Sequence, residues 1–429
     1  MKILFVHPDL GVGGAERLVV DTALAAKSNG HEVTILTNHY DPNHCFEDTR
    51  DLDIKAKFSS WPRHISGRFH AFFAYLKMLL ASIWVIYFSD LKFDVVICDQ
   101  ISLPVCVFKW ANYKVLFYCH FPDQLLCVYD KNKQFLKKIY RAPLDWLEMV
   151  TTGMADVILV NSEFTKKIFY DTFVKLKDKR VDVLYPSLNT EKFDTLLNEF
   201  SNEPNEEPSD LRKIEIKNSN ILELKKSESK KFIFLSINRY ERKKDLKLAI
   251  KAMSELKQKL NLEDWESCHL IMAGGYDPRV GENLNHHAEL LDLAKSLDLL
   301  DHISFLRSIS DTQKIKLLRR TVCLIYTPTN EHFGIVPIEA MYCERPVIAT
   351  NTGGPLETVV NEVTGYLVKS SPSEFAKAME KIITNPQKQQ EMGQNARNRV
   401  IKNFSFIAFQ QKLNSILTNM TSQESKKEN

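Results

Sequence analysis

Short apolar segments of strand length alternate with longer amphipathic segments along most of this chain, and this alternation restricts the fold more than any other feature. In the first half the apolar segments are residues 3–7, 33–37, 95–98, 115–120, 157–161 and 181–185. In the second half they are residues 232–237, 269–273, 303–305, 322–326 and 347–349. Strand followed by helix, repeated, predicts an α/β fold with parallel sheets covered by helices on both faces. Ligands of such sheets bind at the carboxyl ends of the strands.

A polar, charged stretch at residues 198–230 interrupts the alternation and predicts a flexible linker or insertion. The chain has 429 residues, more than one typical domain. We therefore predict two Rossmann-like domains, residues 1–197 and 231–403. An amphipathic stretch at residues 404–417 is expected to pack back on the first domain, and residues 418–429 to form a disordered tail.

The charge and the cysteines restrict the environment of the protein. The formal net charge is only +3, so no polyanion such as a nucleic acid is expected as a partner. Basic residues gather at 212–259, which suits a phosphate group, an anionic membrane surface or a solvated linker. Eight cysteines are scattered without a CxxC pair, which predicts a reduced, cytosol-facing environment without a disulfide framework or zinc site. Pro8 and Asp9 interrupt the apolar N-terminus too early for a secretory signal.

Residues 69–88 form an apolar segment about as long as a helix that crosses a bilayer. His70, Lys77 and Ser82 interrupt it, and the strand-like residues 94–98 follow closely. A mixture of basic and aromatic residues precedes it, which favours a membrane surface. We expect a helix that lies on or dips into a membrane, with a core helix and a membrane span as the alternatives.

Glycine turns follow a predicted strand in each half of the chain. Residues 11–14 resemble a dinucleotide fingerprint, but Asp41 is a poor candidate for the acidic residue that would bind the ribose. Gly13 and Gly14 are expected instead to bring the backbone close to a ligand, and a plain tight turn is the alternative. Gly274 begins a similar turn in the second half and is expected to approach the ligand in the same way.

Several side chains with useful chemistry also follow predicted strands. His120 ends an apolar run, and its imidazole can donate or accept a hydrogen bond to a sugar hydroxyl. Arg239 and Lys244 follow the first strand of the second half. The guanidinium fork and the ammonium point charge suit the oxygens of a diphosphate leaving group. Arg242 and Lys243 compete for the same role.

The segment at residues 331–357, EHFGIVPIEAMYCERPVIATNTGGPLE, carries the most informative pattern. Its carboxylates Glu331 and Glu339 can accept hydrogen bonds from sugar or ribose hydroxyls. A helix is expected to begin near Pro337 and to direct its free N–H groups at an anion. The segment therefore predicts a pocket for a phosphorylated sugar.

Together these motifs resemble the retaining glycosyltransferases of the GT-B fold in family GT4, along nearly the whole chain. The resemblance rests on the GGAE sequence at residues 13–16, on His120, on Arg239 with Lys244, and on the E-x7-E pattern that begins at Glu331. The stretches HPDLGVGGAERLVVD, YCHFPDQLL, SINRYERKKDL and EHFGIVPIEAMYCERPVIATNTGGPLETV are similar to the dolichol-pathway mannosyltransferases that act second and third in lipid-linked oligosaccharide assembly. The resemblance implies two Rossmann-like domains that face each other across a cleft.

The resemblance also implies a role for each residue. Arg239 and Lys244 would hold the diphosphate of GDP-mannose, and Glu339 would bind its ribose. Glu331 would contact the mannose and stabilise positive charge near the anomeric carbon, and His120 would hydrogen-bond the mannose. The residues expected to contribute backbone contacts to the phosphates or the acceptor are Gly13, Gly14, Gly274, Gly334, Ile335 and Val336.

The implied reaction transfers mannose from GDP-mannose to Man1GlcNAc2-PP-dolichol, first in an α-1,3 and then in an α-1,6 linkage, on the cytosolic face of the endoplasmic reticulum membrane. No cofactor and no metal are expected, since the family needs none and no DxD-type pair ends a strand. We find no second carboxylate placed for a double displacement. Same-face attack by the acceptor hydroxyl is therefore expected, with the leaving phosphate accepting its proton. The membrane surface and other early mannosyltransferases of the pathway are the expected partners.

Other functions remain open on the sequence alone. Another GT4 enzyme with a different nucleotide sugar and a lipid-linked acceptor, or an NDP-sugar epimerase on the same fold, would use many of the same residues. A nicotinamide dehydrogenase would be favoured by residues 11–14 alone. A non-catalytic sugar-nucleotide or lipid-binding scaffold would have no need of Arg239, Lys244 and Glu331.

Overall fold

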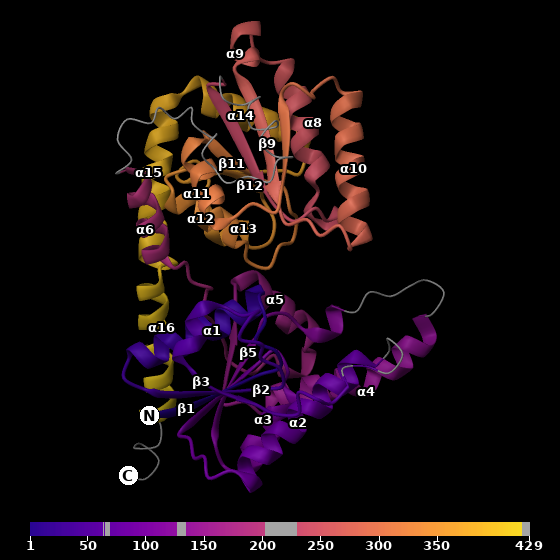
Figure 1. Cartoon of the computed structure of the whole chain (residues 1–429), viewed down its shortest axis with the longest axis vertical. Helices are drawn as coiled ribbons and strands as arrows, with labels where there is room; N and C mark the ends of the chain where they lie inside the picture. The colour runs from indigo at the N-terminus through magenta and orange to yellow at the C-terminus, as the bar shows by residue number, and fades with distance from the viewer. Residues whose placement is uncertain (63, 65–68, 127–133, 202–229, 423–429) are drawn as a thin grey trace. The chain divides into compact units, whose positions relative to one another are not determined.

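The computed structural model describes residues 1–62, 64, 69–126, 134–201 and 230–422 (Figure 1). The chain forms two compact units, one of Met1–Ser187 with Phe406–Asn429 and one of Leu188–Ser405. The first unit ends before residue 197 because α6 (Thr190–Ser201) belongs to the second unit, where Asp194 accepts hydrogen bonds from Tyr342 and Arg397. Most of the linker expected at residues 198–230 lies outside the described residues.

The first unit contains a seven-stranded parallel sheet in the order β3-β2-β1-β4-β5-β6-β7. Its strands are β1 (Lys2–His7), β2 (Glu32–Thr37), β3 (Asp53–Ala56), β4 (Val95–Asp99), β5 (Lys114–Cys119), β6 (Val157–Val160) and β7 (Val181–Val183). Every residue of β4 is buried, as expected for a central parallel strand covered on both faces. The strand order brings the carboxyl ends of β1, β4 and β5 side by side.

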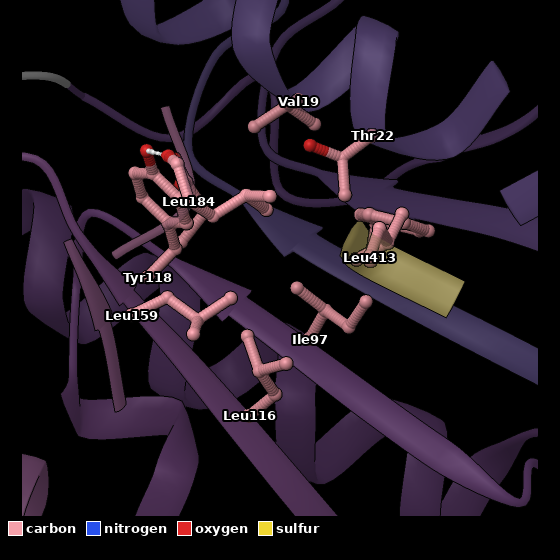
Figure 2. A pocket seen from close by; sticks show the side chains of 10 residues that line it. Val19, Thr22, Ile97, Leu116, Tyr118, Leu159, Leu184 and Leu413 are labelled. Atoms are coloured by element: carbon pink, nitrogen blue, oxygen red, sulfur yellow. Dashed lines mark hydrogen bonds between the residues drawn. The ribbon is translucent and has the colours of Figure 1, made fainter. Parts of the chain in front are cut away.

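Helices cover this sheet, and the last of them comes from the end of the chain. The helices are α1 (Gly14–Ser28), α2 (His70–Phe88), α3 (Leu103–Trp110), α4 (Gln134–Gly153), α5 (Glu163–Thr172) and α16 (Phe406–Ser422). Leu413 and Leu417 of α16 are buried in the core of this unit, and Figure 2 shows Leu413 near Ile97 of β4. Residues 418–422, expected in a disordered tail, continue the helix because Met420 is buried in the same core. The rest of that tail lies outside the described residues.

Helix α2 is partly a core helix of the first unit. In the described part of the chain it is the one helix long and apolar enough to cross a membrane, and 33% of its most apolar window is buried. Tyr75, Met78 and Val85 pack in the core with β4 and β5. Tyr87 and Phe88 at its end are exposed. The helix therefore combines a face in the core with exposed aromatic residues.

The second unit contains a six-stranded parallel sheet in the order β10-β9-β8-β11-β12-β13. Its strands are β8 (Phe232–Ile237), β9 (Cys268–Gly274), β10 (Ile303–Arg307), β11 (Cys323–Tyr326), β12 (Val347–Thr350) and β13 (Gly365–Val368). Its helices besides α6 are α8 (Leu246–Lys257), α9 (Leu262–Glu266), α10 (Gly281–Ser296), α11 (Asp311–Arg320), α12 (Ile335–Tyr342), α13 (Pro355–Thr358), α14 (Pro372–Thr384) and α15 (Pro386–Asn403). The alternation of strand and helix thus produces two parallel sheets, and the two-domain α/β prediction is confirmed.

Candidate active site

His120 lies directly after β5, which ends at Cys119, one residue earlier than expected. Its Nε2 lies 2.9 Å from Oδ1 and 3.1 Å from Oδ2 of Asp99. Its ring packs on the ring of Tyr118, with the centroids 4.9 Å apart. The side chain is 20% exposed. The imidazole is therefore fixed by two neighbours while part of it stays accessible.

Asp99 and His7 complete this cluster, and neither was among the residues singled out from the sequence. Asp99 ends β4 and His7 ends β1, and Nδ1 of His7 lies 2.7 Å from Oδ2 of Asp99. Burial alone would raise the pKa of Asp99, but pairing with His120 and His7 outweighs burial and lowers that pKa to about 2. Asp99 is therefore an ionised carboxylate in the interior. Both residues end their strands in the sequence, but the sequence does not say that β1, β4 and β5 are neighbours.

The glycine turn before α1 lies at the same edge of this sheet. Gly13 is extended, and its carbonyl accepts the first hydrogen bond of α1 from the N–H of Arg17 at 3.0 Å. A Cβ on Gly14 would meet no heavy atom within 4 Å, so its backbone borders open space. A cavity of about 230 Å³ lies at the carboxyl ends of β1 and β2 and is lined by Pro8, Asp9, Asn38, His39, His70, Ala74 and Lys77.

The loop that follows His120 is held by a buried carboxyl group of α4. Glu148 accepts hydrogen bonds from the backbone N–H groups of Asp123 at 2.7 Å and Gln124 at 3.2 Å. Arg141 donates to Oδ2 of Asp123 at 2.9 Å. Burial raises the pKa of Glu148 to about 7, although the two N–H groups act against it. The hydrogen bonds that hold this loop therefore depend on the Glu148 carboxyl group, whose protonation changes with pH.

We expect replacement of Glu148 by glutamine to flatten the pH dependence of stability. The carboxyl group has a higher pKa in the folded chain, about 7, than in the unfolded chain, about 4.3. The folded chain therefore binds more protons between these values, and its stability falls as the pH rises through them and levels off above the folded pKa. Urea unfolding at about pH 5 and about pH 8 should show a loss on the order of 2–3 kcal/mol in the wild type that is missing in Glu148→Gln. Equal pH slopes in the two proteins would contradict this assignment.

In the second unit, Glu331 lies in the loop between β11 and α12, and a glycine pair positions that loop. The carbonyl of Glu331 accepts a hydrogen bond from the N–H of Gly354 at 2.7 Å. Gly353 has a φ of +67°, and a Cβ there would lie 2.6 Å from the carbonyl oxygen of Glu331. A Cβ on Gly354 would lie 2.3 Å from the carbonyl oxygen of Phe333. The loop can approach this closely only because both residues are glycines.

We therefore expect Gly353→Ala to displace Glu331 and to destabilise the second unit. The left-handed backbone and the clash with backbone atoms together should cost about 2–4 kcal/mol, measured by urea unfolding, and transfer activity should fall as well. Gly281→Ala is the matched control, because Gly281 begins α10 and its Cβ would meet nothing within 4 Å. That change should be neutral or stabilising by up to about 1 kcal/mol. Equal stability of the two variants would show that the loop does not depend on Gly353.

Lys244 and Glu331 form an ion pair in which the ammonium group donates to the carboxylate. Lys244 ends the short helical turn η5 (Arg242–Lys244) after β8, and its carbonyl accepts a hydrogen bond from Oγ1 of Thr327 at 2.7 Å. Both side chains are less than a quarter exposed. Because β8 and β11 are neighbours in the sheet, the structure joins two residues that lie far apart in the sequence.

Glu339 pairs with a lysine that the sequence did not indicate. Helix α12 begins at Ile335, two residues before Pro337, with Gly334 in a left-handed conformation at its N-cap. Oε1 of Glu339 lies 2.6 Å from Nζ of Lys314 in α11. Burial raises the pKa of Glu339, while Lys314 opposes this shift. Lys314 lies within a helix without a recognisable motif, so it carried no signal in the sequence.

Arg239 lies beside the glycine turn that follows β9. A Cβ on Gly274 would lie 1.9 Å from the carbonyl oxygen of Asn238, and a Cβ on Gly275 would lie 3.2 Å from Cγ of Arg239. The Arg239 side chain is 63% exposed and pairs with Glu241 at 3.1 Å. Arg239 is not part of the Lys244–Glu331 pair, but like Lys244 it follows the carboxyl end of β8. The guanidinium is therefore accessible to an anion.

The structure thus places the expected residues in two groups. The first sheet carries Gly13, Gly14 and His120. The second carries Arg239, Lys244, Gly274, Glu331, Gly334, Ile335, Val336 and Glu339. Among the described residues, no three His, Cys, Asp or Glu side chains are arranged to hold a metal ion. The described site residues offer paired charges, glycine turns and the N-terminus of α12.

Comparison with known proteins identifies the class of protein to which this chain belongs. The family described as Glycosyltransferase Family 4 matches residues 12–192, and Glycosyl transferases group 1 matches residues 219–399. The solved structure of sucrose-phosphate synthase from Thermosynechococcus elongatus has a TM-score of 0.72 and 19% identity, and the match covers 98% of this chain and 99% of that chain. The chain is a glycosyltransferase with two parallel-sheet domains of the GT-B fold.

More similar relatives narrow this class to one family. Alpha-1,3/1,6-mannosyltransferase ALG2 from Homo sapiens is 48% identical, over 98% of this chain and 96% of the human protein. Alpha-1,3/1,6-mannosyltransferase ALG2 from Dictyostelium discoideum is 45% identical, over 97% of this chain and 98% of that protein. The chain belongs to this family of α-1,3/1,6-mannosyltransferases. The epimerase, dehydrogenase and scaffold alternatives lose their support.

Proposed function

We propose that this chain transfers mannose from GDP-mannose to Man1GlcNAc2-PP-dolichol, first in an α-1,3 and then in an α-1,6 linkage, in lipid-linked oligosaccharide synthesis for protein N-glycosylation. Its similarity to the mannosyltransferase relatives supports this assignment. The observation that carries it is the Lys244–Glu331 ion pair at the carboxyl end of the second sheet. An ammonium group and a carboxylate in contact are what a nucleotide-activated sugar requires, one for the phosphate and one for the sugar hydroxyls.

Donor binding would rearrange this pair. In the structure, Lys244 and Glu331 neutralise each other. A diphosphate attracts Lys244, and the carboxylate of Glu331 is then available to mannose hydroxyls and to positive charge at the anomeric carbon. The exposed guanidinium of Arg239 adds a second cation for the diphosphate. Backbone N–H groups at the start of α12 supply further donors to the phosphate.

Glu339 is proposed to bind the donor ribose. Lys314 occupies Oε1 of its carboxylate, so Oε2 remains to accept hydrogen bonds from ribose hydroxyls. The two cations, Lys244 and Arg239, supply the charge stabilisation of the leaving diphosphate, and the reaction is proposed to need no cofactor and no metal. The acceptor hydroxyl attacks on the face that the diphosphate leaves, and a phosphate oxygen takes its proton.

The first unit is proposed to bind the acceptor and the membrane. His120 would hydrogen-bond a hydroxyl of the mannose, and the cavity at the carboxyl ends of β1 and β2 lies at the same edge of this sheet. Tyr87 and Phe88 at the end of α2, together with Trp110 at the end of α3, expose large apolar surfaces that suit a membrane interface. We propose that the enzyme acts at the cytosolic face of the endoplasmic reticulum membrane and associates with other early mannosyltransferases of the pathway.

A transfer assay tests the proposal. The purified enzyme would be incubated with radiolabelled GDP-mannose and a Man1GlcNAc2-PP-lipid acceptor, and the linkages of the product would be determined. We expect one α-1,3-linked and one α-1,6-linked mannose on the lipid product, with UDP-glucose inactive as a donor. Conversion of the free sugar nucleotide without transfer, or preferred transfer from another nucleotide sugar, would overturn the assignment.

A further inference from the structure

We propose that Asp99 is a positioning residue that sets the tautomer of His120, so that the ring proton lies on Nε2 and Nδ1 faces the ligand as a hydrogen-bond acceptor. The proposal rests on the proposed function, in which His120 contacts a sugar hydroxyl. The observation behind it is the cluster His7–Asp99–His120 at the ends of three neighbouring strands, in which His7 and Asp99 are buried and His120 is partly exposed. The cluster also assigns a role to His7, the partner of Asp99 on β1.

The protonation of the two rings follows from the carboxylate between them. Asp99 is buried, and its pairing with both histidines keeps it ionised. An ionised carboxylate can only accept hydrogen bonds. The nitrogen atoms that face it must therefore carry protons, which are Nε2 of His120 at 2.9 Å and Nδ1 of His7 at 2.7 Å. In a neutral imidazole the other nitrogen is then an acceptor.

The far side of His7 agrees with this arrangement. Its Nε2 is buried and has no hydrogen-bond partner in the described part of the chain. A lone pair in that place is less unfavourable than an N–H group without an acceptor. His7 therefore donates a hydrogen bond from Nδ1 to Asp99. It holds Oδ2 of the carboxylate in place while Oδ1 faces His120.

The other neighbours of Asp99 are mostly apolar, so the two histidines are needed to stabilise its negative charge. Asp99 borders a small cavity lined mostly by apolar side chains, among them Ile97, Leu116 and Leu413. Figure 2 shows this lining, with the hydroxyl of Tyr118 donating to the carbonyl of Leu184 at 2.8 Å. That bond fixes the Tyr118 ring on which His120 packs. In such surroundings a carboxylate stays ionised only when it is paired.

The consequence for recognition is a defined direction of hydrogen bonding. With the proton on Nε2 bound to Asp99, Nδ1 of His120 can only accept, so the sugar hydroxyl at this position must donate. A ring with the proton on Nδ1 would instead offer a donor and would leave Asp99 facing a lone pair. Asp99 therefore acts through His120 and does not itself touch the sugar.

The direct test is the nitrogen chemical shifts of His120 in protein labelled with 15N-histidine, assigned by loss of the signals in His120→Gln. We expect the wild type to carry the proton on Nε2. In Asp99→Asn the amide can donate to Nε2, and the proton is expected to move to Nδ1. The kcat for mannose transfer should fall about 10- to 100-fold, as for the loss of a partner that orients a ligating histidine, while the KM for GDP-mannose changes by less than about threefold.

Asp94→Asn is the matched control at the opposite end of the strand. Asp94 accepts a hydrogen bond from the backbone N–H of Lys2 at 2.7 Å, and this variant should keep both the His120 tautomer and the kcat. A wild-type proton on Nδ1, an unchanged tautomer in Asp99→Asn, or an unchanged kcat despite a changed tautomer would overturn the proposal. The wild-type spectrum shows which nitrogen of His120 carries the proton even if Asp99→Asn does not fold. A failure of the proposed function would appear separately, as absence of mannose transfer by the wild type.

Discussion

Replacement of Lys244 by alanine is expected to lower the kcat for mannose transfer by about 100- to 1,000-fold, the usual effect of removing one preorganised charge from a transition state. Lys244 is largely buried and bonded to Glu331, so its position is set before the donor arrives. Its loss leaves the departing diphosphate with less positive charge. The measurement is steady-state transfer of radiolabelled mannose to the lipid-linked acceptor, with thermal unfolding as a check on folding.

Lys243→Ala is the control for this prediction. Lys243 precedes Lys244 in the same turn, but its side chain is 68% exposed and pairs with Glu241. Its removal changes the net charge of the protein by the same amount, and it should alter kcat by less than about threefold. If the two variants lost activity equally, the effect would come from general charge and not from the ion pair.

Replacement of Glu331 by glutamine is expected to reduce the kcat by about 100-fold, with little change in stability. Glutamine preserves the volume and one acceptor oxygen but removes the negative charge. The backbone of Glu331 stays fixed through the hydrogen bond from Gly354, so the loss should appear in turnover more than in folding. Parallel measurements of kcat, KM for GDP-mannose and the unfolding midpoint separate the two effects.

Glu344→Gln serves as the control for charge removal near α12. Glu344 follows the end of that helix and is exposed, so its neutralisation should leave transfer within about twofold of the wild type. Wild-type turnover in Glu331→Gln would remove this carboxylate from the site and leave the charge at the anomeric carbon without the proposed partner.

The fold could be predicted from the sequence wherever strands are buried on both faces. Such strands are continuous apolar runs, and β4 and β8 were found almost to the residue. The edge strands β3 (Asp53–Ala56) and β13 (Gly365–Val368) were missed. Every residue of β3 is at least partly exposed, so its sequence, DIKA, carries no apolar run. The edge strands β7 and β10 carry apolar residues and were predicted, whereas β3 owes its conformation to pairing with β2, which its own sequence does not reveal.

The sequence predicts those site residues that belong to a recognisable motif. It does not predict those that join the site only because the fold brings them close in space. The E-x7-E pattern indicated Glu331 and Glu339 directly, but their cationic partners follow from the arrangement of strands and helices. Lys244 contacts Glu331 because β8 lies beside β11. Lys314 of α11 contacts Glu339 of α12. Asp99 remained hidden for the same reason. Local sequence shows which strand a residue ends, and only the strand order shows which strand ends meet.

An experimental structure of the enzyme with GDP-mannose bound would test the proposed donor site. We expect the diphosphate to contact Lys244, Arg239 and the N-terminus of α12, and the ribose to contact Glu339. Glu331 should have exchanged Lys244 for the hydroxyls of the mannose. A nucleotide bound elsewhere, with the Lys244–Glu331 pair intact, would contradict this proposal.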